Sequence, residues 1–404
     1  MEDRITGRFE AAAARAGDLG RVGSARSAIS SFIVMDVMRA AMASEAAGRH
    51  IIHMEVGQPG TPAPRAAREA VKRAVDSATL GYTMALGNDA LRQRIAVHYA
   101  DWYGVTVGAE RIAVTSGSSG AFVLAFLALF DVGDAVALPS PGYPCYRHIL
   151  TALGQRPVLI ETGPAGDWMP TPEDIARAAS RDGIKGLVLA SPANPTGTMI
   201  SAERLAELAR ACRACGVALI SDEIYHGLAY THPAATALAG GDDVIVINSF
   251  SKYFSMTGWR VGWMVVPQQL IAAVERLAQN LYISPPAIAQ VAALSAFDAR
   301  EELEANRRVY AANRELLLNE LPVAGFANFA PPDGAFYLYC DVSHMTDDAA
   351  SLASRLLQEA GVAVTPGIDF DAERGNRFLR FSYAGSTADM TEAALRLRSW
   401  AGKR

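Results

Sequence analysis

The chain has 404 residues, of which half are apolar and 20% are charged. This composition is typical of a globular protein with two or three domains. The formal net charge is −5 and the basic residues are scattered, which argues against binding to nucleic acid or to an anionic membrane. The longest apolar run, at 121–130, is ten residues long, about half of what a membrane span needs.

The charged start of the chain, MEDRITGRFE, lacks the apolar core of a signal peptide. Four cysteines are too few for a disulfide framework in a chain of this length, so we expect a cytoplasmic protein. Cys212 and Cys215 form a C-x-x-C pair within a helical pattern, and no second pair follows. We interpret both as helix residues rather than as a zinc or redox site, and we expect no metal.

Short apolar runs alternate with amphipathic helical stretches from residue 46 to about 300. Helices are expected at 61–77, 119–130, 171–181 and 201–215, and strands at 51–56, 111–115, 135–138, 186–190, 217–221, 244–248 and 261–266. Several of these strands are apolar throughout, as strands covered on both faces are. The alternation predicts an α/β domain with a mostly parallel sheet at 46–300.

The pattern changes near residue 300. A long polar helix at 300–321 ends at Pro322, and a helix at 349–360 lies among expected strands at 335–341, 362–365 and 377–382. These features predict a smaller α+β domain at 301–404. The alanine-rich segment 1–45 has a helical pattern, and we expect it to pack with that domain.

Polar groups follow four of the expected strands, where ligands bind in open α/β sheets. Asn194, Asp222 and Lys252 each come shortly after a strand, and SGSSG at 116–120 opens a helix. The N-terminus of a helix favours a phosphate through its free N–H groups and its dipole. Neither G-x-G-x-x-G nor a Walker A pattern occurs, which disfavours a dehydrogenase. A phosphorylated aldehyde carried on a lysine accounts for all four features.

The stretch around Lys252, SFSKYFSMTGWRVG, resembles the lysine segment of class I/II aminotransferases, which are pyridoxal-phosphate enzymes of fold type I. Further motifs follow in that family's order: GQPG (57–60), GYTMALGNDALR (81–92), TSGSSGAF (115–122), PSPGYPCY (139–146), SPANPTG (191–197), SDEIYHGL (221–228), DGAFY (333–337) and LRFSYA (379–384). The resemblance implies a mixed, mostly parallel seven-stranded sheet flanked by helices, a smaller α+β domain, and pyridoxal 5′-phosphate as cofactor.

The resemblance also implies catalytic roles. Lys252 would bind the cofactor through its amine and then move a proton between the substrate α-carbon and the cofactor, which requires a lowered pKa. Asp222 would pair with the pyridine nitrogen and keep it protonated, which makes the ring a better electron acceptor. Tyr225 and Asn194 would hydrogen-bond the 3-oxygen of the ring, and the ring of Tyr143 would stack on its face.

Other matched positions would bind the phosphate and the substrate. The phosphate would meet Ser118, Ser119, Ser249 and Arg260. Tyr82 matches a tyrosine that the family contributes from the neighbouring subunit, which implies a homodimer with shared sites. The α-carboxylate of the amino acid would be bound by Arg380, with the backbone around Gly57 closing over it, and Asn194 and Phe32 would be further substrate-binding residues.

The pocket for the side chain of the substrate determines which amino acids are accepted. Dicarboxylate-selective relatives often carry a lysine near the position of Ser119, and this chain has none there. Phe32, with Ser31 and Ile33, matches a segment that lines the pocket, and Phe32 and Ile33 are bulky and apolar. We therefore expect a neutral, apolar or aromatic amino donor, with 2-oxoglutarate or pyruvate as acceptor in a ping-pong mechanism.

Two other functions fit parts of the pattern. The same fold and lysine serve cysteine–sulfur β-lyases, which release ammonia and pyruvate without an oxo-acid acceptor. Aminotransferase-like modules also act as non-catalytic sensors fused to DNA-binding domains. The chain has no room for a winged-helix domain before residue 45, and every matched cofactor position is present, so the sensor is the weaker alternative.

Overall fold

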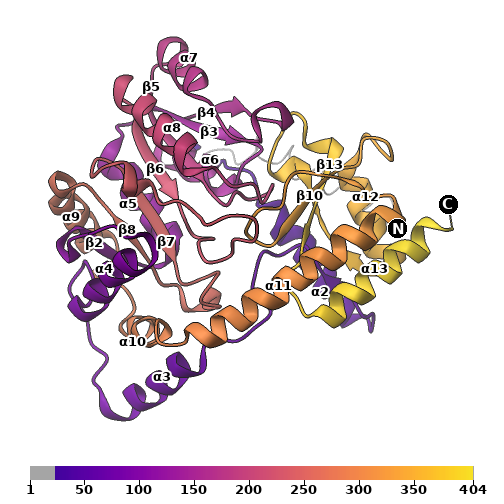
Figure 1. The fold of residues 1–404 in the computed structure, drawn as a ribbon, viewed down its shortest axis with the longest axis horizontal. Coiled ribbons are helices and arrows are strands. Elements are labelled where there is room, and N and C mark those ends of the chain that lie inside the picture. The colour runs from indigo at the N-terminus through magenta and orange to yellow at the C-terminus, as the bar shows by residue number, and fades with distance from the viewer. Residues whose placement is uncertain (1–22, 404) are drawn as a thin grey trace.

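The computed structural model describes residues 23–403, and its largest element is a mixed seven-stranded sheet (Figure 1). The strand order is β2-β8-β7-β6-β5-β3-β4. Strand β8 runs antiparallel to both of its neighbours, β2 and β7, and all other pairings in this sheet are parallel. The strands are β2 (Ile112–Thr115), β3 (Ala135–Ser140), β4 (Arg156–Glu161), β5 (Ile184–Ala190), β6 (Ala218–Asp222), β7 (Ile245–Ser249) and β8 (Gly262–Val265).

Helices cover both faces of this sheet, because successive strand side chains point to opposite faces and both sets are apolar. On β5, Val188 belongs to a core cluster with α5, α6 and α9, whereas Leu187 and Leu189 belong to the cluster that includes α4, α7, α8 and α10. These helices are α4 (Asp89–Tyr103), α5 (Gly117–Leu129), α6 (Pro144–Leu153), α7 (Pro172–Asp182), α8 (Ala202–Ala214), α9 (Ile271–Leu281) and α10 (Ala287–Ala296).

Six of the seven expected strands lie in this sheet, and the prediction of a mostly parallel α/β fold is confirmed. The expected strand at 51–56 lies elsewhere: only β1 (Ile52–His53) forms, and it pairs in parallel with β11 (Val362–Ala363). The seventh strand is β4, which the sequence reading missed. It lies at the sheet edge, and its alternating burial gives no continuous apolar run.

A second sheet of four antiparallel strands lies beyond the carboxyl ends of β5 and β6, in the order β12-β13-β10-β9 (Figure 1). Its strands are β9 (Asn328–Phe329), β10 (Tyr337–Asp341), β12 (Thr365–Pro366) and β13 (Phe378–Ser382). The helices around it are α2 (Ile33–Ala46), α11 (Arg300–Glu320), α12 (Ala349–Arg355) and α13 (Thr387–Ala401). The remaining helix, α3 (Arg65–Ser77), packs on α10.

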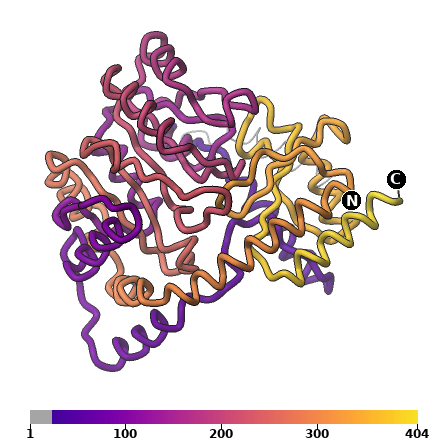
Figure 2. Tube along the Cα trace, viewed as in Figure 1, coloured from indigo at the N-terminus to yellow at the C-terminus, as the bar shows by residue number. Residues whose placement is uncertain are grey.

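The N-terminal helix α2 packs against β11 and β12, and Figure 2 shows it beside the C-terminal part of the chain. The expected helical structure at 1–22 lies outside the described residues. The predicted division at residue 300 stays a prediction. Among residues 23–403, no helix is long and apolar enough to span a membrane.

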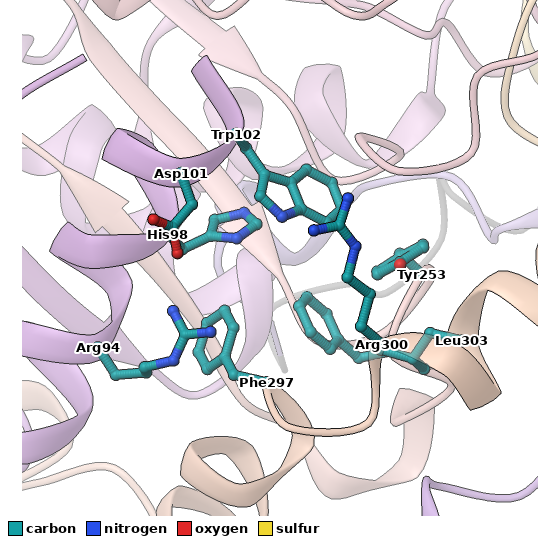
Figure 3. A pocket seen from close by; sticks show the side chains of 9 residues that line it. Arg94, His98, Asp101, Trp102, Tyr253, Phe297, Arg300 and Leu303 are labelled. Atoms are coloured by element: carbon teal, nitrogen blue, oxygen red, sulfur yellow. The ribbon is translucent and has the colours of Figure 1, made fainter. Parts of the chain in front are cut away.

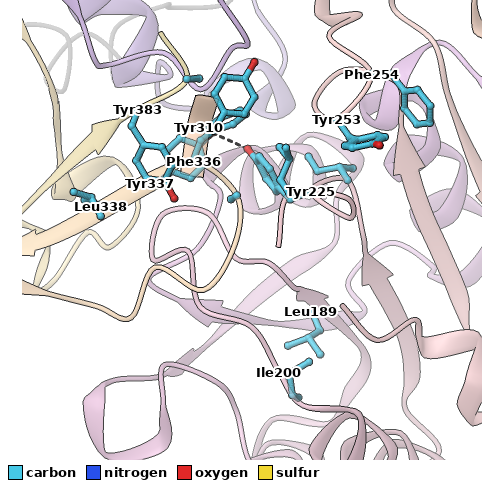
Figure 4. Close-up of a cluster of buried hydrophobic side chains, with 14 of the residues drawn as sticks. Leu189, Ile200, Tyr225, Tyr253, Phe254, Tyr310, Phe336, Tyr337, Leu338 and Tyr383 are labelled. Atoms are coloured by element: carbon cyan, nitrogen blue, oxygen red, sulfur yellow. Dashed lines mark hydrogen bonds between the residues drawn. The ribbon is translucent and has the colours of Figure 1, made fainter. Parts of the chain in front are cut away.

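The two sheets are joined by a buried aromatic cluster (Figure 4). The ring of Tyr225, shortly after β6, packs edge-on against Phe336 and Tyr337 at the start of β10. Tyr310, on α11, packs against Phe336 in the same way. This cluster places the ends of the central strands next to the second sheet, and the candidate site lies at that junction.

Candidate active site

Lys252 lies in the segment that follows β7, and its amine points to the chain near β1. The Nζ atom donates a hydrogen bond of 2.7 Å to the carbonyl oxygen of Gly57. A Cβ atom at Gly57 would lie 1.7 Å from the hydroxyl oxygen of Tyr337, so a side chain cannot fit there. Gly57 therefore lets the backbone approach the lysine and the aromatic cluster together.

The charge state of Lys252 is strongly perturbed. Burial lowers its pKa from 10.5 to about 8, and the positive charge of Arg380 adds to this effect. Asp222 opposes the shift by attracting the ammonium group, and Arg260 lowers the pKa further. Near pH 8, a substantial fraction of the Lys252 side chain is therefore the neutral amine.

Asp222 is the last residue of β6, and its carboxylate is buried. One oxygen, Oδ1, accepts a hydrogen bond of 3.1 Å from the backbone N–H of Ile224, and Oδ2 accepts one from the hydroxyl of Tyr146. Burial raises the pKa of Asp222 to about 6, although both hydrogen bonds lower it. Such a carboxylate stabilises a proton on a neighbouring base.

The sequence reading did not assign Tyr146 to the site. It lies on the first turn of α6, three residues after Tyr143, and the two rings pack edge-on at 5.3 Å. The spacing of three residues puts both rings on one face of the helix. That spacing was the available signal, but the pairing with Asp222 depends on how α6 packs on the sheet.

An anion cradle forms where α5 begins beside Arg260. A Cβ atom at Gly117 would lie 2.5 Å from the Nη2 atom of Arg260, so the guanidinium occupies the space that the glycine leaves. Ser116, at the N-cap of α5, makes no side-chain cap, which leaves the first N–H groups of the helix free for a ligand. Arg260 adopts a left-handed backbone and also donates to Thr257 O at 3.0 Å.

The three predicted phosphate-binding serines lie at this cradle or beside it. Ser118 and Ser119 are in the first turn of α5, half-buried and exposed respectively. Ser249 ends β7 and is buried, and its hydroxyl donates to Ser251 at 2.9 Å. Gly262 on β8 pairs with Ser249 on β7. A Cβ atom at Gly262 would lie 3.0 Å from the backbone nitrogen of Ser118. The structure therefore brings both ends of the predicted phosphate site together.

Arg380, on β13, is buried beside the lysine. Its Nη1 atom donates to Asn194 Oδ1 at 2.8 Å, and its Nη2 atom donates to the carbonyl of Glu55 and to Thr365 Oγ1. Its Nε atom is buried and has no hydrogen-bond partner among the described residues. The sequence reading brought Arg380 and Asn194 to one site but did not identify Glu55 or Thr365.

Aromatic rings enclose the guanidinium of Arg380. The ring centroids of Tyr337 and Phe370 lie 4.4 and 4.7 Å from its central carbon. The hydroxyl of Tyr337 is also 2.7 Å from that of Tyr225 (Figure 4). Arg380, Tyr337 and Tyr225 thus form one connected group, with the Tyr225 ring 5.7 Å from the Lys252 amine.

Two further predicted residues mark the outer parts of the site. Phe32, just before α2, packs edge-on against Tyr143 with ring centroids 5.8 Å apart. Tyr82 is 84% exposed, and no hydrogen bond links its side chain to the other residues within 23–403. The chain itself therefore leaves Tyr82 available to a neighbouring molecule.

These groups fit pyridoxal phosphate by their chemistry. Lys252 would supply an amine for the aldehyde, Asp222 a carboxylate for the ring nitrogen, and Arg260 with the start of α5 a cradle for the phosphate. The fold and the site together define a pyridoxal-phosphate enzyme of fold type I. The chain belongs to the aminotransferase class I and II family, whose sequence pattern matches residues 49–397.

Individual relatives agree with this assignment. The chain is 47% identical to a valine–pyruvate aminotransferase from Mycobacterium tuberculosis, over 93% of this chain and 97% of the relative. A crystal structure of an aminotransferase from the same organism superposes with a TM-score of 0.92 at 46% identity, covering 95% and 99% of the two chains. Aspartate aminotransferase from Thermus thermophilus, solved with maleate, gives 0.88 at 33% identity, covering 94% and 99%.

Proposed function

We propose that this aminotransferase moves the amino group of a neutral, apolar L-amino acid to a 2-oxo acid, with pyruvate as the favoured acceptor. The choice of amino donor rests on the apolar wall next to Arg380, the arginine that is proposed to bind the substrate carboxylate. Phe370 covers Arg380, and it belongs to a hydrophobic cluster with Val34 and Phe32. Phe32 in turn contacts Tyr143 beside the site.

An apolar wall selects among amino acids by side-chain desolvation. A branched or aromatic side chain gains free energy when it leaves water for such a wall, whereas a carboxylate loses solvation and finds no new charge there. Discrimination by this means is about 1–3 kcal/mol for each methylene group that is added or lost. The relative from Mycobacterium tuberculosis, a valine–pyruvate aminotransferase, supports the same donor class.

The chain's own residues have separable tasks in this reaction. Pyridoxal phosphate, when bound, supplies an aldehyde that condenses with amines and a ring that accepts electrons from the substrate α-carbon. Lys252 would hold the cofactor, and its Nζ atom, with a pKa of about 8, would take the α-proton and return it. Asp222 would hold a proton at the ring nitrogen, and Tyr146 orients that carboxylate.

On binding, the substrate carboxylate would replace oxygen atoms that already accept hydrogen bonds from Arg380. Arg380 presents a planar fork whose partners are neutral oxygens of Asn194, Glu55 and Thr365. A substrate carboxylate is a stronger acceptor than any of these, because the resulting hydrogen bonds are charge-assisted and bidentate. Tyr337 and Phe370 hold the guanidinium plane in position and exclude water from it.

Steady-state kinetics with matched substrates tests this proposal. Valine, leucine, methionine, phenylalanine, alanine and aspartate are compared as donors, each with pyruvate and with 2-oxoglutarate. We expect the apolar donors to exceed aspartate in kcat/KM by at least tenfold, which corresponds to about 1.4 kcal/mol of transition-state binding. A preference for aspartate would contradict the proposed pocket.

Half-reactions separate transamination from the β-lyase alternative. In a ping-pong aminotransferase, an amino acid alone changes the cofactor absorbance, and a 2-oxo acid restores it without net release of ammonia. A β-lyase would instead release ammonia and pyruvate from cysteine or a related donor with no acceptor present. Parallel lines in double-reciprocal plots are the kinetic counterpart of the first result.

We also propose that the protein acts as a cytoplasmic homodimer with shared sites. The exposure of Tyr82 supports the shared site, because this side chain is free to enter a neighbouring molecule. All four cysteines are free thiols, which supports a reducing compartment. Cys212 and Cys215 lie in the last turn of α8 and at its C-cap.

A further inference from the structure

A pocket of about 320 Å³ lies between α4 and the start of α11, separate from the cofactor site (Figure 3). One wall is a face of α4 that carries Arg94 and, two turns later, Trp102. The opposite wall comes from Phe297 and Arg300 at the junction of α10 and α11, and Tyr253 closes one side. None of the residues assigned to cofactor or substrate lines this pocket.

Arg94 carries a hydrogen-bond donor that the fold does not use. Its guanidinium carbon lies 4.4 Å from the ring centroid of Phe297. Its Nη1 atom is buried and has no hydrogen-bond partner within residues 23–403. The guanidinium of Arg94 lines the pocket and forms no ion pair with any residue in 23–403, so its charge is available to an anion there.

A second cation and a helix N-terminus lie at the same pocket. Arg300 is exposed and forms no ion pair with any residue of the described chain. It is the first residue of α11, whose N-cap, Ala299, provides no side-chain acceptor. The positive end of this 21-residue helix lies beside Arg300, and Glu301 and Glu302 in its first turn offset part of that charge.

Among the residues that line the pocket, cations outnumber carboxylates, and the nearby carboxylate of Glu304 is ion-paired with Arg307. Asp101 is the one carboxylate among the lining residues, against two arginines. His98 stays neutral, because burial and the nearby Arg94 lower its pKa to about 3. The pocket therefore has a net positive character and selects an anion.

The rest of the lining is aromatic. Trp102, Phe297 and Tyr253 present ring surfaces to the cavity (Figure 3). Tyr253 is held in place by its hydroxyl, which donates to Glu304 Oε1 at 2.8 Å. Flat apolar groups gain most from such surroundings, both by leaving water and by contact between rings.

We propose that this pocket binds a small aromatic carboxylate. The carboxylate group accepts hydrogen bonds from Arg94 and Arg300, and the ring lies among Trp102, Phe297 and Tyr253. Tyr253 directly follows Lys252, so the occupied pocket contacts the segment that carries the site lysine. Binding at this place is distinct from substrate binding at Arg380.

Titration of the holoenzyme with phenylacetate tests the proposal through tryptophan fluorescence. We expect a saturable change in emission that disappears in Trp102→Phe. Arg94→Gln and Arg300→Gln should each raise the Kd about tenfold or more, since each removes a charge-assisted hydrogen bond. Arg308→Gln, an exposed arginine two turns further along α11, is the matched control and should leave the Kd unchanged.

Three results would overturn the proposal. A Kd that is the same in Arg300→Gln would remove the assigned cation, and this exposed position is suited to the test because its change leaves the core intact. Loss of the response in Arg380→Gln would place the ligand in the substrate site. Equal binding of acetate or inorganic phosphate would show that the rings contribute nothing. A melting temperature equal to that of the unmodified protein confirms that each variant is folded.

Discussion

The surroundings of Lys252 disfavour its charged form, which is the basis of its proposed reactivity. A buried ammonium group beside the cations Arg380 and Arg260 is disfavoured, and Asp222 offsets only part of that cost. The neutral amine is the form that attacks an aldehyde and accepts a proton from carbon. The neighbours of Lys252 therefore set the pH range in which it works.

The first prediction concerns the rate at which pyridoxal phosphate enters the cofactor-free protein. Below pH 8 the amine is mostly protonated and unreactive, so the rate should rise with pH and level off above a midpoint of about 8. A lysine with an ordinary pKa would not level off until about pH 10.4. Stopped-flow absorbance at a series of pH values measures this midpoint, and Lys252→Ala should give no reaction.

Arg380→Gln provides the control for the cause of the shift. Removing this cation relieves the repulsion, so the midpoint should move to higher pH. Arg260→Gln should move it in the same direction by less, because Arg260 contributes less to the lowered pKa. An unchanged midpoint in Arg380→Gln would mean that Arg380 does not contribute to the lowered pKa of Lys252.

Tyr146→Phe is a second prediction at the scale of one residue. The change keeps the ring, which packs against Tyr143, and removes only the hydroxyl that donates to Asp222. Hydrogen bonds to charged groups are worth about 1.5–3 kcal/mol, so the cofactor should bind at least tenfold more weakly and kcat should fall. Equilibrium dialysis of the cofactor measures the first effect.

Tyr143→Phe is its matched control. This variant also loses one tyrosine hydroxyl from α6, but Asp222 keeps both of its hydrogen bonds. Its cofactor affinity should therefore stay within a few-fold of the unmodified protein. Equal losses in the two variants would show that the effect comes from the helix and not from Asp222.

At the scale of elements, the start of α2 is held by a residue more than 330 positions away. The carboxylate of Asp369 accepts hydrogen bonds of 3.2 Å from the backbone N–H groups of Ile33 and Val34. Its own carbonyl accepts one of 2.7 Å from Arg147 on α6. This cap fixes the position of Phe32, and through it the apolar wall of the site.

Asp369→Ala should therefore change substrate binding rather than chemistry. Losing a helix cap costs about 1–2 kcal/mol, which loosens the first turn of α2 and displaces Phe32. We expect KM for valine and leucine to rise several-fold while kcat changes little. Asp369→Asn keeps one acceptor oxygen and should recover part of the loss. Equal KM values in all three proteins would show that α2 does not set donor affinity.

The sequence predicted elements well where burial is uniform. Strands covered on both faces, such as β6 and β7, are almost entirely buried and begin with an apolar run, and their predicted bounds differ from the observed ones by one residue. The edge strand β4 was missed because its residues alternate between buried and exposed. The apolar run at 51–56 was assigned to the wrong sheet, because composition does not reveal that Ile52 pairs with Val362.

At the candidate site, too, the sequence predicts some residues and not others. Motifs that are continuous in sequence, around Lys252, Asp222 and Asn194, led to the residues that the structure brings together. The contacts that hold them cannot be predicted in the same way, although Tyr146 itself stands in the motif PSPGYPCY. Tyr146 reaches Asp222 only through the packing of α6, and the Glu55 carbonyl reaches Arg380 only through the folding of distant segments. Tertiary pairings of this kind leave no local pattern to read.

At the scale of the whole molecule, two exposed segments lie side by side near Tyr82. Gln290 donates to Thr83 Oγ1 and to Pro285 O, both at 3.0 Å, and so ties the two segments together. Tyr82 and Met84 on one segment and Ile283 on the other are large apolar side chains exposed to solvent. Exposed apolar patches mark interfaces more often than free surface, and the shared-site dimer would cover this one.

Mixed dimers of Lys252→Ala and Tyr82→Ala test that arrangement. Each variant alone should have little activity, the first without its amine and the second with a weakened phosphate site. If Tyr82 serves the partner's site, a mixed dimer contains one complete site, because the chain that keeps Lys252 receives Tyr82 from the other chain. Random mixing makes half of the dimers mixed, so the activity should recover to about a quarter of the unmodified level.

The two variants carry different tags, which allows the mixed dimer to be purified after co-expression. If Tyr82 acts within its own chain, every mixed dimer has one site without an amine and one without Tyr82, and no recovery follows.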